Sequence, residues 1–129
     1  MTNREIMEYD VVVVGAGPSG LSAAIKLKQL YNEANKDLSV CVIEKGSEVG
    51  AHIVSGAVIE TKALDELIPD WKSKNSPLKT EAKDDKFLYL TKTKSYQLPT
   101  PPQMHNKGNF IISLSDFTKW LAQQAEEIE

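Results

Sequence analysis

The sequence has one cysteine, Cys41, among its 129 residues. A single cysteine can form neither an internal disulfide nor the ligand set of a cysteine-bound zinc or iron–sulfur site. Cys41 lies in the apolar run 40–43, so we expect a buried and unreactive thiol. This cysteine usage also favours a reduced, intracellular setting.

Excess positive charge and long apolar runs are also missing. The 15 Lys and Arg are outnumbered by 18 Asp and Glu, and the net charge is −3. No basic stripe could neutralise a phosphate backbone, so nucleic acid is not an expected partner. No run of about 18 apolar residues could span a bilayer. The opening MTNREIMEYD has neither the apolar core of a signal peptide nor the basic character of a transit peptide.

Metal-ligand clusters and hydrolase motifs are absent too. His52 and His105 have no companion cysteine or carboxylate at metal-ligand spacing, so we expect no metal site. Each histidine either lines a cofactor pocket or is a solvated loop residue. Ser55 lacks a G-x-S-x-G context, which argues against a nucleophilic serine and favours a contact near bound cofactor.

What the sequence does contain is a glycine motif between a predicted strand and a predicted helix. The β-branched run 10–14 predicts a buried strand, and residues 18–31 predict a helix. Between them, Gly15, Gly17 and Gly20 keep the G-x-G-x-x-G spacing. In dinucleotide-binding folds these glycines allow a tight turn, backbone approach to the pyrophosphate and close packing of helix on strand. The N–H groups at the helix N-terminus then attract the anionic pyrophosphate.

The next predicted strand, 38–43, ends at a carboxylate, Glu44. A right-handed crossover sets this strand parallel and adjacent to the first, with both carboxyl ends at one edge. There Glu44 can accept hydrogen bonds from the adenosine ribose, and its charge disfavours the 2′-phosphate of NADP. The residues therefore predict a strand–helix–strand dinucleotide-binding unit, and the motif alone does not separate FAD from NAD.

Smaller elements are predicted for the rest of the chain. The glycine-punctuated segment 44–60 predicts an irregular loop near the nucleotide, and residues 62–68 predict a short helix. The stretch 72–86 interleaves lysines with acids and predicts a solvated surface. The remaining predicted elements are strands at 87–90 and 95–98 joined through 91–94, a rigid turn at 99–102, a strand at 110–114 and a final helix.

Ser115 is the expected N-cap of that final helix. Its expected apolar face comprises Phe117, Trp120, Leu121 and Ile128. Three carboxylates within 126–129 lie at the negative end of the helix dipole without a glycine or basic cap. The chain also supplies few strands for a doubly wound fold. From both observations we expect a fragment or a truncated reading frame.

Four longer stretches carry a resemblance to a known family. They are YDVVVVGAGPSGLSAAIKLKQL, VCVIEKGSEVGAHIVSGAVIE, LDELIPDWK and LPTPPQMHNKGNFIISLSDFTKWLAQQAE. Over residues 9–127 the chain resembles the N-terminal part of the electron transfer flavoprotein-ubiquinone oxidoreductase family. The second and fourth stretches are the more specific ones, because many flavoproteins share the first. The fold class implied is α/β: a Rossmann-like FAD-binding domain of the glutathione-reductase type, incomplete and with an added β-hairpin region.

The resemblance implies FAD as the cofactor. The glycine motif and Glu44 would bind the ADP half, and the segment Gly50–Gly56 would run beside the cofactor toward the flavin. The candidate cofactor-binding residues are Gly15, Ala16, Gly17, Pro18, Ser19, Gly20, Glu44, Lys45, Gly50, Ala51, His52, Ser55 and Gly56. No residue is expected to act as a catalytic acid or base.

The resemblance also implies an activity and partners. The family takes electrons from reduced electron transfer flavoprotein and passes them to ubiquinone at a membrane surface, using a [4Fe-4S] cluster as well. Its cluster cysteines lie in a C-terminal region absent here, so this chain is expected to be inactive alone. The implied location is peripheral, on the cytoplasmic face of a bacterial inner membrane or on the mitochondrial inner membrane of a eukaryote. Residues 90–96 are rich in Lys and Thr, so no membrane contact is assigned within the chain.

The expected organisation is a strand–helix–strand unit over 1–60, followed over 61–129 by a helix, a β-hairpin, a strand and a terminal helix, with later domains absent. Two other functions remain open on the residues. One is a related FAD-dependent reductase or hydroxylase, similar to geranylgeranyl reductase, that shares the first motif but has a substrate pocket instead of a cluster. The other is a nucleotide-binding module without catalysis.

Overall fold

The computed structural model describes residues 5–128. The start of the opening segment, 1–4, and the last carboxylate of the acidic end, Glu129, lie outside the described residues. The chain divides into two compact units. The first unit combines the residues up to 54 with those from 114 onward, and the second unit comprises residues 55–113. The expected division at residue 60 stays a prediction.

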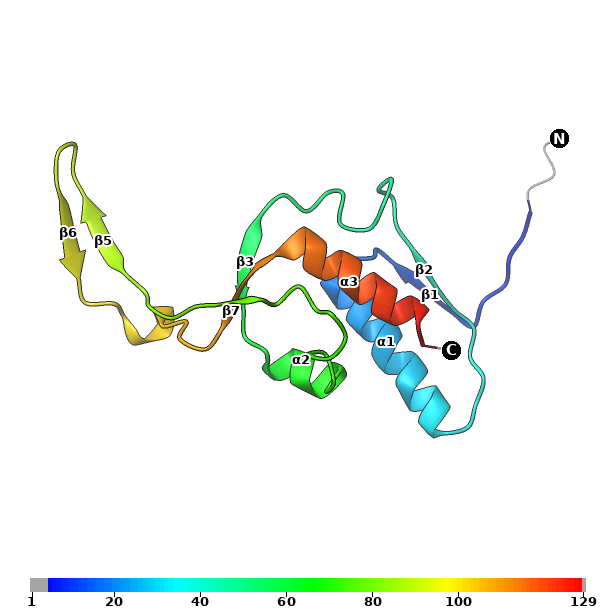
Figure 1. The fold of residues 1–129 in the computed structure, drawn as a ribbon. Coiled ribbons are helices and arrows are strands. Elements are labelled where there is room, and N and C mark those ends of the chain that lie inside the picture. The colour runs from blue at the N-terminus through cyan, green and yellow to red at the C-terminus, as the bar shows by residue number, and fades with distance from the viewer. Residues whose placement is uncertain (1–4, 129) are drawn as a thin grey trace. The chain divides into compact units, whose positions relative to one another are not determined.

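The first unit contains a parallel strand–helix–strand arrangement. Its elements are β1 (Val11–Val14), α1 (Pro18–Glu33), β2 (Val40–Ile43) and α3 (Leu114–Glu126). β1 and β2 pair in parallel, with Val11 opposite Val40 and Val14 opposite Ile43 (Figure 1). The carboxyl ends of both strands therefore meet at one edge, as the sequence predicted.

The core of the first unit lies where α1 and α3 pack side by side (Figure 1). Leu21 and Ile25 of α1 are buried, as are Phe117 and Leu121 of α3. Burial of such side chains stabilises a fold by about 1.5–3 kcal/mol each. The expected apolar face of the last helix is confirmed within these residues, although Ile128 lies beyond the end of α3 and is only half-buried.

The second unit is built mainly from antiparallel strands. Its elements are β3 (Gly56–Ile59), α2 (Lys62–Leu67), β4 (Thr80–Glu81), β5 (Phe87–Leu90), β6 (Ser95–Leu98), the 3-10 helix η1 (Pro102–Met104) and β7 (Phe110–Ser113). One sheet has the order β3-β7-β4, and β5 and β6 form a separate hairpin. The predicted short helix, the two hairpin strands and the strand at 110–114 are confirmed.

Two predictions for this unit are wrong. Residues 56–59 form a strand, not a loop, because Gly56 pairs with Ser113 and Ile59 with Phe110 in an antiparallel ladder. The stretch 72–86 is not uniformly solvated, since Leu78 and Ala82 are buried and β4 pairs with β7. In both places β7, more than 25 residues away in sequence, supplies the partner that local composition does not reveal.

Two side chains of the first unit also differ from expectation. Cys41 is half-buried in β2 and not fully buried. Ser115 is not an N-cap, because α3 already begins at Leu114 and Ser115 lies in its first turn. Its hydroxyl instead donates to the backbone oxygen of Gly50, at 3.0 Å.

Candidate nucleotide-binding site

The glycine loop between β1 and α1 forms a tight turn at the strand edge. Gly15 has a φ of +102°, and its N–H donates to the oxygen of Ile43 at 2.7 Å. A Cβ on Gly20 would stand 2.1 Å from the oxygen of Gly15, so only glycine lets α1 start this close to β1. A Cβ on Gly17 would have no atom within 4 Å. The space in front of the helix N-terminus is therefore open, as an approaching pyrophosphate requires.

Glu44 joins this loop to the chain that follows β2. Its Oε2 accepts the N–H of Ala16 at 2.9 Å, and its Oε1 accepts the N–H of Gly46 at 2.8 Å. These two bonds hold the pKa of Glu44 below its ordinary value. The bond from Gly46 has the larger effect, and the bond from Ala16 has the next largest. A carboxylate offers about four lone-pair sites, so two stay available to ribose hydroxyls. The sequence pointed to the ribose contact but missed this bracing of the glycine loop.

A cavity of about 320 Å³ lies at the carboxyl edge of β1 and β2. Its lining residues are Val14, Gly15, Ile43, Glu44 and Lys45. Val14 is 81% exposed and Ile43 48% exposed, which gives the cavity apolar walls beside one carboxylate. That combination suits the flat ring and the ribose of a nucleoside, and the volume falls within the usual range for ligand pockets.

The loop after β2 is held against the start of α3. The hydrogen bond from Ser115 to Gly50 is joined by an ion pair between Lys119 Nζ and Glu48 Oε1, at 3.0 Å. Gly50 has a φ of +83°, and a Cβ there would stand 2.9 Å from the Ser115 hydroxyl oxygen. Ser115 and Lys119 are positioning residues that sequence reasoning missed, because the chain separates them from the loop by more than 60 residues.

The structure brings most, but not all, of the predicted site residues together in the first unit. The glycine loop carries Gly15, Ala16, Gly17, Pro18, Ser19 and Gly20, and the end of β2 carries Glu44 and Lys45. Gly50, Ala51 and His52 lie on the braced loop, where the charge of His52 is a lesser cause of the lowered Glu44 pKa. Ser55 and Gly56 belong to the second unit, in which Gly56 starts β3.

The described residues contain no group of three or more His, Cys, Asp or Glu side chains placed to hold a metal ion. Within residues 5–128, no helix combines the length and apolarity needed to cross a membrane.

A parallel strand–helix–strand unit with a glycine loop and an acid at the second strand end defines the class of Rossmann-like dinucleotide-binding domains. A family model described as the NAD(P)-binding Rossmann-like domain matches residues 13–69. This agrees with the predicted fold class.

The particular relatives are electron transfer flavoprotein-ubiquinone oxidoreductases, and the chain is homologous to them over nearly its whole length. The mitochondrial protein of Dictyostelium discoideum is 63% identical over 97% of this chain, and that of Pseudomonas aeruginosa is 58% identical over 95%. The mitochondrial protein of Rattus norvegicus is 48% identical over 94%. The chain spans about one fifth of the length of these curated relatives, 21%, 23% and 20% respectively.

Proposed function

We propose that the chain is the N-terminal, FAD-binding part of an oxidoreductase that passes electrons from reduced electron transfer flavoprotein to ubiquinone. One observation carries the proposal: the open helix N-terminus, the carboxylate of Glu44 and an apolar-walled cavity lie at one sheet edge. This arrangement belongs to a chain that is 63% identical, over 97% of its length, to a relative of that name. The names of these relatives support electron transfer flavoprotein as the electron donor and ubiquinone as the acceptor.

The residues of the first unit fit the ADP half of FAD. The N–H groups at the start of α1 would bind the pyrophosphate, and Glu44 would accept the ribose hydroxyls. Glu44 already accepts the N–H of Ala16, so the glycine loop is oriented before the nucleotide arrives. The braced loop with Gly50 and His52 would continue toward the flavin. FAD, when bound, supplies reversible electron uptake by its isoalloxazine ring.

The residues of this chain do not fit an iron–sulfur cluster. Cys41 is its only cysteine, and it lies in β2. A [4Fe-4S] cluster needs about four thiolates. In the proposed enzyme, the cluster ligands therefore lie outside these 129 residues.

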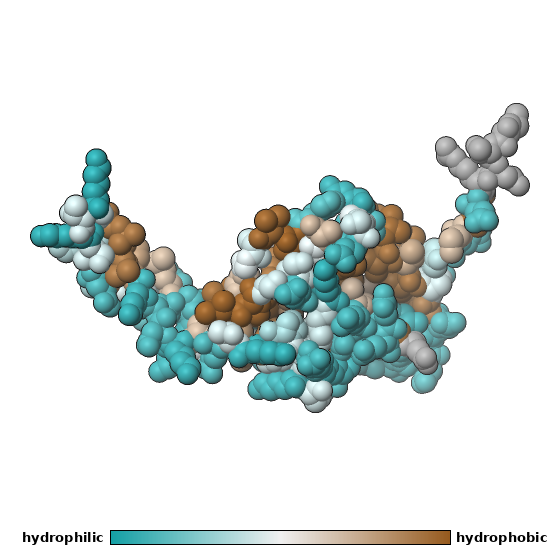
Figure 2. Space-filling model, turned by 45° about the horizontal axis from the view of Figure 1, so that its top comes forward, coloured by the Kyte–Doolittle hydropathy of each residue, from teal (hydrophilic) through white to brown (hydrophobic). Residues whose placement is uncertain are grey.

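We further propose that the β5–β6 hairpin makes the peripheral membrane contact that the family resemblance implies. The ladder places Phe87 opposite Leu98 and Tyr89 opposite Tyr96, so these four side chains share one face of the hairpin. All four are exposed, Tyr89 by 61%. Figure 2 shows apolar groups on the hairpin and hydrophilic groups at its tip, where Lys92 and Lys94 lie. Tyrosines flanked by lysines are typical of membrane–water interfaces, so the Lys-rich tip does not argue against contact.

Flavin content and electron transfer test the proposed function. The full-length protein that contains this chain, purified from its own source, should carry FAD, should be reduced by electron transfer flavoprotein and should then be reoxidised by a short-chain ubiquinone. The single change Gly17→Leu places a large side chain in the open space before α1 and should abolish flavin retention. A protein that retains a nicotinamide, or that holds FAD but exchanges no electrons with the flavoprotein, would contradict the proposal.

A further inference from the structure

We propose that a hollow in the second unit binds a small ligand that joins an anionic group to an apolar group. The hollow has a volume of about 350 Å³ and is lined by the loop 71–79 together with Phe110 of β7. We call it the Trp71 hollow. It lies outside the glycine loop and the residues around Glu44, so the inference is independent of the proposed function.

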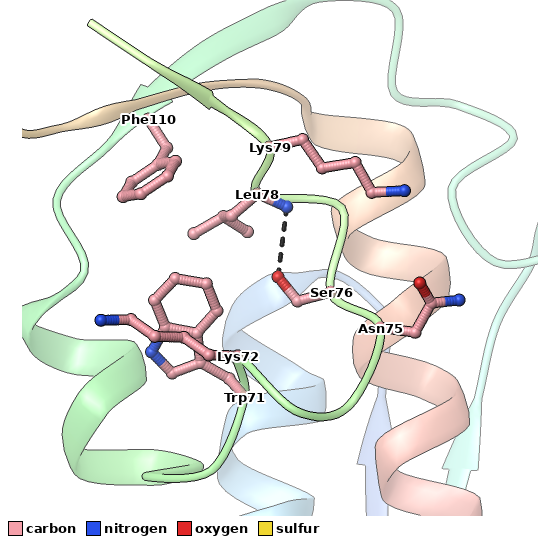
Figure 3. A pocket seen from close by; sticks show the side chains of 7 residues that line it. All are labelled: Trp71, Lys72, Asn75, Ser76, Leu78, Lys79 and Phe110. Atoms are coloured by element: carbon pink, nitrogen blue, oxygen red, sulfur yellow. Dashed lines mark hydrogen bonds between the residues drawn. The ribbon is translucent and has the colours of Figure 1, made fainter.

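The floor of the Trp71 hollow is apolar and ordered. The rings of Trp71 and Phe110 meet edge to face with centroids 5.9 Å apart, and Leu78 completes the floor (Figure 3). Trp71 is 3% exposed and Leu78 6% exposed. The indole Nε1 of Trp71 donates to Asp65 at 2.6 Å, which fixes the ring. An apolar body can therefore rest on a surface that is already formed.

The loop that carries the lining side chains is held by local hydrogen bonds. The N–H of Trp71 donates to Ile68, and the N–H of Lys74 donates to Trp71. Asn75 then adopts a φ of +49°, and the buried hydroxyl oxygen of Ser76 accepts the N–H of Leu78 at 3.1 Å (Figure 3). Such a preformed hollow loses little conformational entropy when a ligand binds.

Positive charge stands on both sides of the hollow. Lys72 and Lys79 line it, and Figure 3 shows their ammonium groups on opposite sides. Lys72 Nζ lies 5.4 Å from the centre of the Trp71 ring, above its face. No acidic side chain is among the lining residues. The nearby Asp65 accepts hydrogen bonds from Trp71 and from the hydroxyl of Thr61, and its charge also interacts with that of Lys72. A negative group between the two lysines would therefore meet attraction from either side.

The volume sets the size of the ligand. At about 30 Å³ per water molecule, the hollow equals the volume of about twelve waters, and hence suits about a dozen non-hydrogen atoms. Lysine ammonium groups are point charges that select negative charge and not a planar geometry. A carboxylate on a phenyl or short acyl chain has the required chemistry. It could be a free small molecule or an acidic side chain next to an aromatic residue of a protein.

Indole NMR of the 129-residue chain tests the proposal, because its two tryptophans report on different units. Trp71 forms the floor of the hollow, whereas Trp120 stacks on Phe117 in the first unit and serves as the internal reference. A titration with 4-phenylbutanoate should shift the Trp71 Nε1–H signal with an apparent Kd of about 1 mM and leave Trp120 unmoved. Its neutral analogue, 4-phenylbutanamide, should bind about three- to tenfold more weakly.

The double change Lys72→Met and Lys79→Met should abolish this preference for the carboxylate while the amide binds as before. Lys83→Met is the matched control, because Lys83 is exposed and does not line the hollow. The peptides acetyl-Phe-Glu-amide and acetyl-Phe-Gln-amide distinguish the sources: preference for the glutamate peptide alone identifies an acidic protein segment, and preference for 4-phenylbutanoate alone identifies a small carboxylate. Equal affinity for carboxylate and amide, or no shift of Trp71, overturns the proposal.

Discussion

The most informative single residue is Glu44, because one carboxylate combines two roles. It braces the glycine loop through Ala16 and Gly46, and its remaining lone pairs face the proposed ribose site. The lowered pKa of Glu44 means that the carboxylate stays charged throughout the neutral range. The bracing bonds, unlike the ribose contact, exist without a nucleotide.

Glu44→Gln tests these two roles together. The amide keeps one acceptor oxygen but turns an NH2 group toward the second backbone N–H, so one bracing bond is lost. We expect about a tenfold loss of FAD or ADP affinity, with no change in helix content, measured by calorimetry and circular dichroism. Glu33→Gln is the control, since Glu33 is exposed at the end of α1 opposite to the glycine loop. Unchanged affinity in Glu44→Gln would rule out both roles.

Gly20 and Gly17 offer a matched pair for separating folding from binding. Gly20→Ala puts a Cβ 2.1 Å from a backbone oxygen, so helix and strand must move apart. We expect a loss of about 2 kcal/mol or more in the free energy of unfolding, measured with urea. Gly17→Ala places its Cβ in open space, so stability should hold while nucleotide affinity falls. Equal stability of the two variants would contradict the close approach of α1 to β1.

At the scale of elements, the sequence predicts the helices and strands whose own residues favour that structure, and it misses the strands that depend on a distant partner. β1, α1 and β2 are confirmed because β-branched runs, a proline in the first helical turn and a terminating carboxylate all agree. β3 and β4 were missed because both depend on pairing with β7. The contact of Ser115 also depends on a distant partner, because only the folded chain brings Gly50 within reach of its hydroxyl.

The base of the β5–β6 hairpin is closed by a hydrogen-bonded carboxylate. Asp85, just before β5, accepts the backbone N–H of Asn106 at 2.7 Å and its side-chain N–H at 2.9 Å. The hydroxyl of Thr100 also donates to the backbone oxygen of Asp85, at 3.4 Å. These contacts join the chain before the hairpin to the chain after it.

This closure should depend on pH. The two hydrogen bonds from Asn106 lower the pKa of Asp85 below its ordinary value, and the bond from the backbone N–H has the larger effect. The folded state therefore prefers the ionised carboxylate. A depressed folded-state pKa contributes stability above the ordinary value of about 3.9 and loses it as pH falls through the lowered one. The Asn106 amide NMR signal should therefore titrate with a midpoint below that of a free aspartate. In Asp85→Asn this titration should vanish, and a midpoint at or above 3.9 in the unmodified chain would contradict the closure.

At the scale of the whole molecule, the residues predicted for the nucleotide site divide unequally between the two compact units. The first unit holds the glycine loop, Glu44 and the cavity at the strand edge. The second unit holds Ser55 and Gly56, the two predicted site residues nearest the expected flavin end. Among the described residues, β1 and β2 form the one parallel pair. The ADP half of FAD is therefore the part for which this chain has the better-defined contacts.

This unequal division of the site residues predicts the relative affinities of the 129-residue chain for ADP, FAD and FMN. ADP and FAD should bind with dissociation constants within about threefold of each other, because the glycine loop and Glu44 contact only the part they share. FMN lacks the adenosine half and should not compete in equilibrium dialysis. Gly17→Ala should weaken ADP and FAD alike. FAD that binds more than about tenfold tighter than ADP, a difference of about 1.4 kcal/mol, would contradict this prediction. The segment from Gly50 to Gly56 would then also contact the flavin half of FAD.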